Sequence, residues 1–188
     1  MIIWKHERKG VRKLTKYEEI ICEYEQDVDV VEYNFSSDNI KGLYSDGVVA
    51  INYKLATNEK IGTIAEELGH HFTSCGNLID VHSTSNRKQE LRARLWGYNK
   101  LIGLCGLIDA FEHHCQNMYD IADYLNVTTD YLKEAIHAYQ NKYGNYVELD
   151  NYIIQFNYPS IGIIKNIKSE TPLVIRVDSS LNYNIIKE

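Results

Sequence analysis

The chain has 188 residues, of which 44% are hydrophobic and 24% are charged, as is ordinary for a globular protein. Its formal net charge of -6 argues against a protein that coats nucleic acid, for which a basic surface is expected. No apolar run is long enough to span a membrane, and the first residues lack the apolar core of a signal peptide. The four cysteines show no Cys-x-x-Cys spacing, so we expect reduced thiols and a cytoplasmic protein.

The N-terminal part of the chain predicts one helix and a small antiparallel sheet. Thr15 is a helix-capping residue, and apolar side chains recur at helical spacing from there to about Asp27. Asp46 and Gly47 favour the positive φ angles of a tight hairpin turn. The predicted strands are residues 28–33, 42–44 and 48–53.

The next predicted helix carries the sequence Glu66-Glu67-x-x-His70, one residue away from the His-Glu-x-x-His motif of zinc peptidases. In that motif, two ligands four residues apart share a helix face and hold one metal ion, while the Glu between them reaches the attacking water. Here Glu66 stands in the position of the first histidine. The alternative is an ordinary Glu–His surface pair, which contributes a few tenths of a kcal/mol.

The surroundings of this motif favour a site. Apolar residues at helical spacing place the motif beside a buried face. These residues are Ile61, Ile64, Leu68 and Phe72. Gly69 costs about 1 kcal/mol relative to Ala inside a helix, which is easier to understand if another backbone approaches it closely.

A second helix, predicted to begin near Arg87, offers Glu90 as a third ligand. Ala93 and Gly97 lie on roughly the same face, and such small residues let another helix pack closely. Alternatively, Glu90 forms an ion pair with Arg94 at i, i+4, and the spacing alone does not decide between the two. The other face is expected to lie in the core. Its residues are Leu91, Leu95, Tyr98, Ile102 and Cys105.

These motifs together resemble the ImmA/IrrE metallo-endopeptidases, small cytosolic zincin-like proteins of prophages and mobile elements. The resemblance spans most of residues 15–145. It is carried by segments 40–44, 48–52, 65–71, 85–94 and 121–128. The resemblance implies an α+β fold with a zincin-like core, in which Glu66, His70 and Glu90 hold the metal and Glu67 is the catalytic carboxylate.

The resemblance also implies one divalent metal ion. Zinc is the default expectation, and manganese or iron are alternatives because a set with two carboxylates is harder than one with two histidines. The metal lowers the pKa of a bound water and polarises the scissile carbonyl, while Glu67 takes the water's proton and passes it to the leaving amine. An extra carboxylate weakens the Lewis acidity of the metal, so we expect lower activity than in a two-histidine relative. His71 and His82 are expected to be loop or surface residues.

The remainder of the chain predicts a helical segment and a β-rich extension. Helices are expected at residues 107–115, 118–125 and about 128–143, the last two with the turn chemistry of a helix-turn-helix. Asp130 and Glu134 at the start of the last helix would face DNA phosphates unfavourably, so direct nucleic-acid binding is not expected. The extension is expected to be a small sheet, an extra edge over the core, or a docking arm.

The sequence therefore predicts three parts: a metallopeptidase core (1–106), a helix-turn-helix-like segment (107–145) and a β-rich C-terminal extension (146–188). Three functions are open. The first is an intracellular endopeptidase whose protein substrate, by resemblance, is a phage-type helix-turn-helix repressor. The second is a pseudo-peptidase that acts as an antirepressor or adaptor by protein binding. The third, a sequence-specific DNA binder, is disfavoured by the acidic charge.

Overall fold

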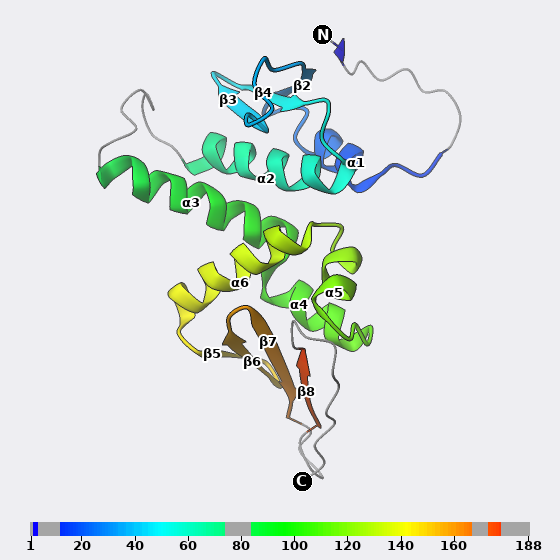
Figure 1. Ribbon diagram of the computed structural model, residues 1–188, viewed down its shortest axis with the longest axis vertical. Coiled ribbons are helices and arrows are strands. Elements are labelled where there is room, and N and C mark those ends of the chain that lie inside the picture. Colours follow the sequence, from blue (N-terminus) through cyan, green and yellow to red (C-terminus); the bar gives the residue numbers. More distant parts are fainter. Residues whose placement is uncertain (1, 4–11, 74–83, 167–172, 178–188) are drawn as a thin grey trace. The chain divides into compact units, whose positions relative to one another are not determined.

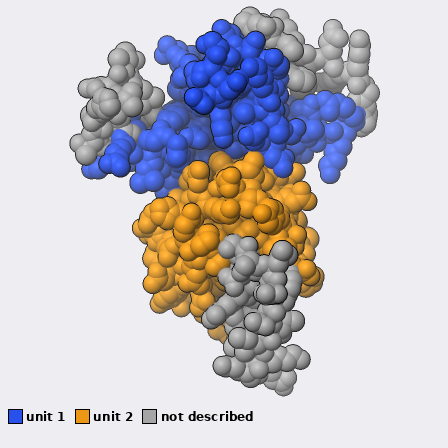
Figure 2. Space-filling view, in the orientation of Figure 1, with its two compact units in different colours: residues 1–97 blue, residues 98–188 orange. Residues whose placement is uncertain are grey.

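The computed structural model has an α+β fold. It contains two four-stranded sheets, each with its own helices (Figure 1). The structure describes residues 2–3, 12–73, 84–166 and 173–177. The chain divides into two compact units, residues 1–97 and 98–188 (Figure 2). This boundary falls within a helix, and the three-part division expected from the sequence stays a prediction.

The first unit begins with a capped helix and ends in a long one. Its elements are β1 (Ile2–Ile3), α1 (Lys16–Glu23), β2 (Asp29–Tyr33), β3 (Gly42–Ser45), β4 (Val48–Asn52), α2 (Thr57–Thr73) and the first part of α3 (Thr84–Leu101). The predicted cap at Thr15 is confirmed, because its side chain accepts a hydrogen bond from Glu18 N–H in a capping box. The helix ends at Glu23, earlier than the predicted Asp27.

The sheet of the first unit is mixed, so the prediction of an antiparallel sheet was wrong. β3 and β4 do form the predicted antiparallel hairpin, with positive φ at Asp46 and Gly47. β2, however, pairs in parallel with β4, and the unpredicted strand β1 pairs antiparallel with β2. The tight hairpin reverses the chain between β3 and β4, so β4 runs in the direction of β2 and pairs with it. β3 is left at the edge of the sheet.

Helix α2 lies between this sheet and α3 (Figure 1). Ile61, Ile64 and Leu68 are buried as predicted, and α2 packs against β3 and β4. Phe72 is 43% exposed, and its ring stacks on Trp96 of α3.

The predicted core face of α3 was wrong in part. Leu91 is 59% exposed, and Cys105 is exposed and lies beyond the end of α3 at Leu101, whereas Ala93 is fully buried. The reason lies in the packing of α3 on α2. A Cβ added at Gly69 would lie 2.2 Å from the carbonyl oxygen of Ala93, so the helices meet through their smallest residues. Residues 74–83, His82 among them, lie outside the described residues.

The second unit has three further helices and an antiparallel sheet. Its elements are the end of α3, then α4 (Gly103–Glu112), α5 (Met118–Tyr124), α6 (Thr129–Tyr143), β5 (Tyr146–Leu149), β6 (Tyr152–Asn157), β7 (Ser160–Lys165) and β8 (Leu173–Val177). The strands pair in sequence order, which is the small sheet that was one of three expectations. α6 packs on this sheet. The helix-turn-helix reading of α5 and α6 stays a prediction. Among the described residues, no helix has the length and apolar character needed to cross a membrane.

Candidate metal centre

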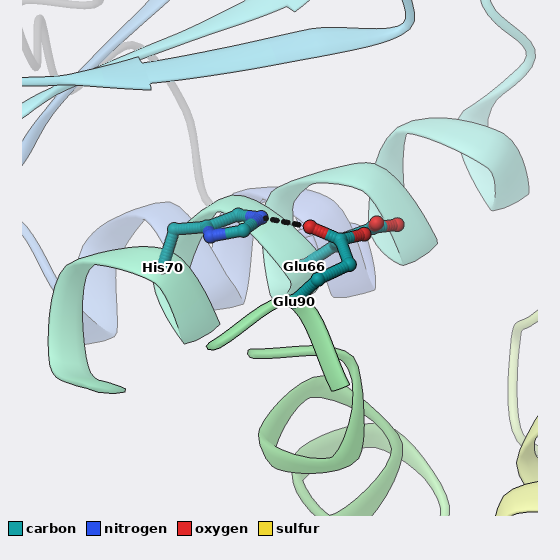
Figure 3. Close-up of side chains that lie close together, drawn as sticks. All are labelled: Glu66, His70 and Glu90. Atoms are coloured by element: carbon teal, nitrogen blue, oxygen red, sulfur yellow. Dashed lines mark ion pairs between the residues drawn. The ribbon is translucent and has the colours of Figure 1, made fainter. Parts of the chain in front are cut away.

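Three side chains from two helices converge in the first unit. Glu66 and His70 lie four residues apart on α2, and Glu90 reaches them from α3 (Figure 3). Each offers one ligand atom, and these atoms lie within 4.8 Å of one another. His70 Nε2 lies 3.3 Å from Glu90 Oε2. The structure thus brings together the three residues that the sequence marked as ligands.

This convergence depends on how closely the two helices approach. Gly69 lies against the backbone of Ala93, and Ala93 is one turn after Glu90. Without side-chain bulk at that contact, α3 comes near enough for Glu90 to reach His70. The sequence argument that Gly69 permits a close backbone approach is confirmed.

Glu67 turns toward strand β3. The backbone N–H of Tyr44 donates a hydrogen bond to its carboxylate. A Cβ at Gly42 would lie 2.5 Å from Thr63 Cγ2 and 2.9 Å from Glu67 Oε1, so a larger residue there would displace one or both of these side chains. The sequence pattern indicated neither Gly42 nor Tyr44 as part of the site. A glycine at the start of an edge strand was the available signal.

Burial raises the pKa of Glu67 to about 7, and the charges of Glu66 and Glu90 act in the same direction. The charge of His70 and the hydrogen bond from Tyr44 N–H lower it, but by less. A carboxyl group that titrates near neutrality can both accept and return a proton at physiological pH. This property fits the role that the sequence assigns to Glu67.

His70 and Glu90 form an ion pair across the two helices. The hydrogen bond from His70, acting together with the guanidinium of Arg94, lowers the pKa of Glu90 to about 2. The same hydrogen bond raises the pKa of His70 above its usual value. A histidine must be neutral to bind a metal ion. Metal binding would therefore release a proton from His70 and would compete with the ion pair between His70 and Glu90.

Arg94 contacts both carboxylates of the cluster. Its Nε lies 2.7 Å from Glu90 Oε1 and 3.1 Å from Glu66 Oε1. The sequence left open whether Glu90 faces the helix α2 cluster or pairs with Arg94, and the structure shows both contacts. The pair between Arg94 and Glu66 was not foreseen, because residues 28 apart in sequence meet only once the helices have packed.

His71 points away from His70, as its position next to it predicts. It lies within α2 and is half-buried, so the expectation of a loop or surface residue was wrong. Its Nδ1 is hydrogen-bonded to Tyr44 Oη at 2.9 Å, and the same hydroxyl accepts a hydrogen bond from Gly47 N–H. These bonds tie the β3–β4 hairpin to α2. Tyr44 therefore contributes twice: its backbone N–H contacts Glu67, and its side chain ties strand β3 to α2.

The chain matches a known protein family. The family Peptidase_M78, described as the IrrE N-terminal-like domain, matches residues 23–137, more than half of the chain. The chain belongs to this family. The match confirms the resemblance to the ImmA/IrrE metallopeptidases and includes all four candidate site residues. No curated protein and no solved structure matches the chain.

Proposed function

We propose that the protein is an intracellular metal-dependent endopeptidase of the ImmA/IrrE type. The observation that carries the proposal is the convergence of Glu66, His70 and Glu90 beside a carboxyl group, Glu67, whose pKa lies near neutrality. Helices pack readily without such a cluster, and burying polar groups of this kind costs free energy unless they are hydrogen-bonded, paired or bound to a metal ion. Membership of a metallopeptidase family makes hydrolysis of a peptide bond the reaction to test.

The donor set fits a divalent cation. One imidazole nitrogen and two carboxylates, brought within 4.8 Å, suit zinc, with manganese or iron as alternatives. When bound, the metal would polarise the scissile carbonyl and make a water molecule more acidic.

Glu67 supplies the proton transfers in this proposal. Its carboxylate takes a proton from the attacking water and gives it to the leaving amine. The hydrogen bond from Tyr44 N–H and the close fit against Gly42 hold the carboxylate in one place. β3 is an edge strand in the described sheet, and an extended peptide could add to such an edge beside the site. The substrate that the family resemblance favours is a phage-type helix-turn-helix repressor.

Metal content is the first test. We expect the purified protein to hold about one divalent ion, and Glu66→Ala and His70→Ala to lose it, as measured by elemental analysis after dialysis. His137→Ala and Glu148→Ala are matched controls, since both residues are exposed and lie in the second unit. Metal retained by Glu66→Ala would remove Glu66 from the ligand set.

Cleavage is the second test. The metal-loaded protein should cut unfolded casein and a phage-type helix-turn-helix repressor, and Glu67→Gln should lower the rate by about 10²-fold or more while keeping the metal. Cleavage unchanged in Glu67→Gln would contradict the role of this residue.

One observation favours a second function, an adaptor that binds a repressor without cutting it. Glu66 replaces a histidine, and Arg94 pairs with both Glu66 and Glu90, so the cluster is balanced internally without a metal. Failure of the protein to bind zinc, manganese or iron, together with tight binding of uncut repressor, would establish this alternative.

A further inference from the structure

Arg94 and His70 contact different oxygens of the Glu90 carboxylate, and Arg94 also contacts Glu66. Its Nε lies against Oε1 of Glu66 and Oε1 of Glu90, at 3.1 and 2.7 Å. The other oxygen of Glu90, Oε2, lies 3.3 Å from His70 Nε2. The ion pair with Arg94 thus uses one oxygen of Glu90 and leaves the second on the side of His70.

The net charge of the ligand set indicates a role for Arg94. In a set with two neutral histidines and one glutamate, the protein contributes one negative charge. Glu66 and Glu90 with neutral His70 contribute two negative charges, and the guanidinium of Arg94 cancels one of them. Arginine keeps its charge at any pH that the protein tolerates. With Arg94 counted, the centre therefore has the same net charge as the two-histidine set.

We infer that Arg94 is a positioning residue that serves as the built-in counter-cation of the metal centre and offsets the carboxylate of Glu66 in the first ligand position. The inference rests on the proposed metal centre and adds a determinant of its affinity. It also revises the expectation that Glu66 must weaken the Lewis acidity of the metal, because the extra negative charge is shared with the guanidinium. Coulomb repulsion between Arg94 and a bound dication keeps the affinity lower than two carboxylates alone would give.

The test is a set of dissociation constants for zinc and manganese, measured by competition with a chelating indicator at fixed pH and salt. Arg94→Gln removes the charge but keeps a hydrogen-bonding side chain, and it should bind both ions about 5- to 20-fold more tightly, a range that allows for the exposure of this site. Arg94→Lys keeps the charge and should stay within about twofold of the wild type. Arg92→Gln is the matched control, since it removes the same charge from an exposed position of the same helix.

A second comparison tests the same charge argument in a centre with a single carboxylate ligand. Glu66→His leaves Arg94 beside a centre with one carboxylate, so it should bind zinc less tightly than Glu66→His combined with Arg94→Gln. Circular dichroism of each metal-free variant verifies the fold.

Every outcome of these measurements either supports or overturns the inference. Unchanged or weaker metal binding in Arg94→Gln, or a lysine variant that behaves like the glutamine variant, would overturn the inference while leaving the metal centre intact. Absence of metal binding in every variant, the wild type included, would overturn both the inference and the proposed function.

Discussion

Both units pack a helix on a four-stranded sheet, but the two helices carry different kinds of side chain. In each, one helix lies on a four-stranded sheet: α2 on the first and α6 on the second. The residues that α6 buries include Leu132, Ile136 and Tyr139, and the Tyr139 hydroxyl accepts a hydrogen bond from Gly103 N–H. Helix α2 also buries an apolar face, but Glu66, Glu67 and His70 lie beside it.

The contrast shows that a helix on a sheet needs no acidic–histidine cluster to be stable. Among the described residues, the only group of side chains placed to hold a metal ion lies in the first unit. The polar groups of α2 are therefore best explained by chemistry, and those of α6 by packing. The predictions below test this difference from the largest expected effect to the smallest.

Gly69→Ala should be strongly destabilising. The new Cβ would meet the carbonyl oxygen of Ala93 at 2.2 Å, and a backbone atom cannot move aside without separating α2 from α3. We expect a loss of about 2–3 kcal/mol in the free energy of unfolding and at least tenfold weaker metal binding, measured by urea denaturation and metal titration.

Gly106→Ala in α4 is the control for this substitution. There the new Cβ meets only the end of the Leu125 side chain, at 3.3 Å, and alanine favours the helix. Its stability should stay within about 1 kcal/mol of the wild type. Equal losses at both glycines would mean that the contact between α2 and α3 is not special.

Glu67→Gln should stabilise the metal-free protein above neutral pH. Because burial raises the pKa of Glu67 to about 7, ionising it costs folding free energy. The stability that the protonated Glu67 contributes to the wild type is fully present below the unfolded pKa of about 4.5. It is lost as the pH rises through about 7.

The stability difference between Glu67→Gln and the wild type should therefore grow between pH 4.5 and 7 and level off above, at about 1–2 kcal/mol after allowing for partial exposure. Urea denaturation at several pH values measures it, and the lowest pH is the internal control. A difference independent of pH would show that Glu67 does not carry the raised pKa.

Two tyrosine–histidine pairs allow a direct comparison of the units. Tyr44 is bonded to His71 in a part-buried place and also accepts from Gly47 N–H, whereas the pair of Tyr124 with His113 is exposed. Tyr44→Phe should cost about 1 kcal/mol, and Tyr124→Phe less than about 0.5 kcal/mol. If the pair in the first unit holds β3 in place, Tyr44→Phe should also slow peptide cleavage; an effect on stability alone would make it structural.

The sequence by itself determined the local features of this protein. The cap at Thr15, the turn at Asp46 and Gly47, the motif helix and the helices of the second unit all follow from contacts within a few residues. The three candidate ligands followed as well, because a spacing of four on a helix is local and the family pattern supplied Glu90.

Only the tertiary structure decided the rest. The parallel pairing of β2 with β4, the fit of Glu67 against Gly42 and the ion pair of Arg94 with Glu66 join residues far apart in sequence. Periodicity describes one element at a time, and it says which face is apolar but not which neighbour covers it. The charge balance of the centre, on which its metal chemistry depends, therefore became visible only when α3 was packed against α2.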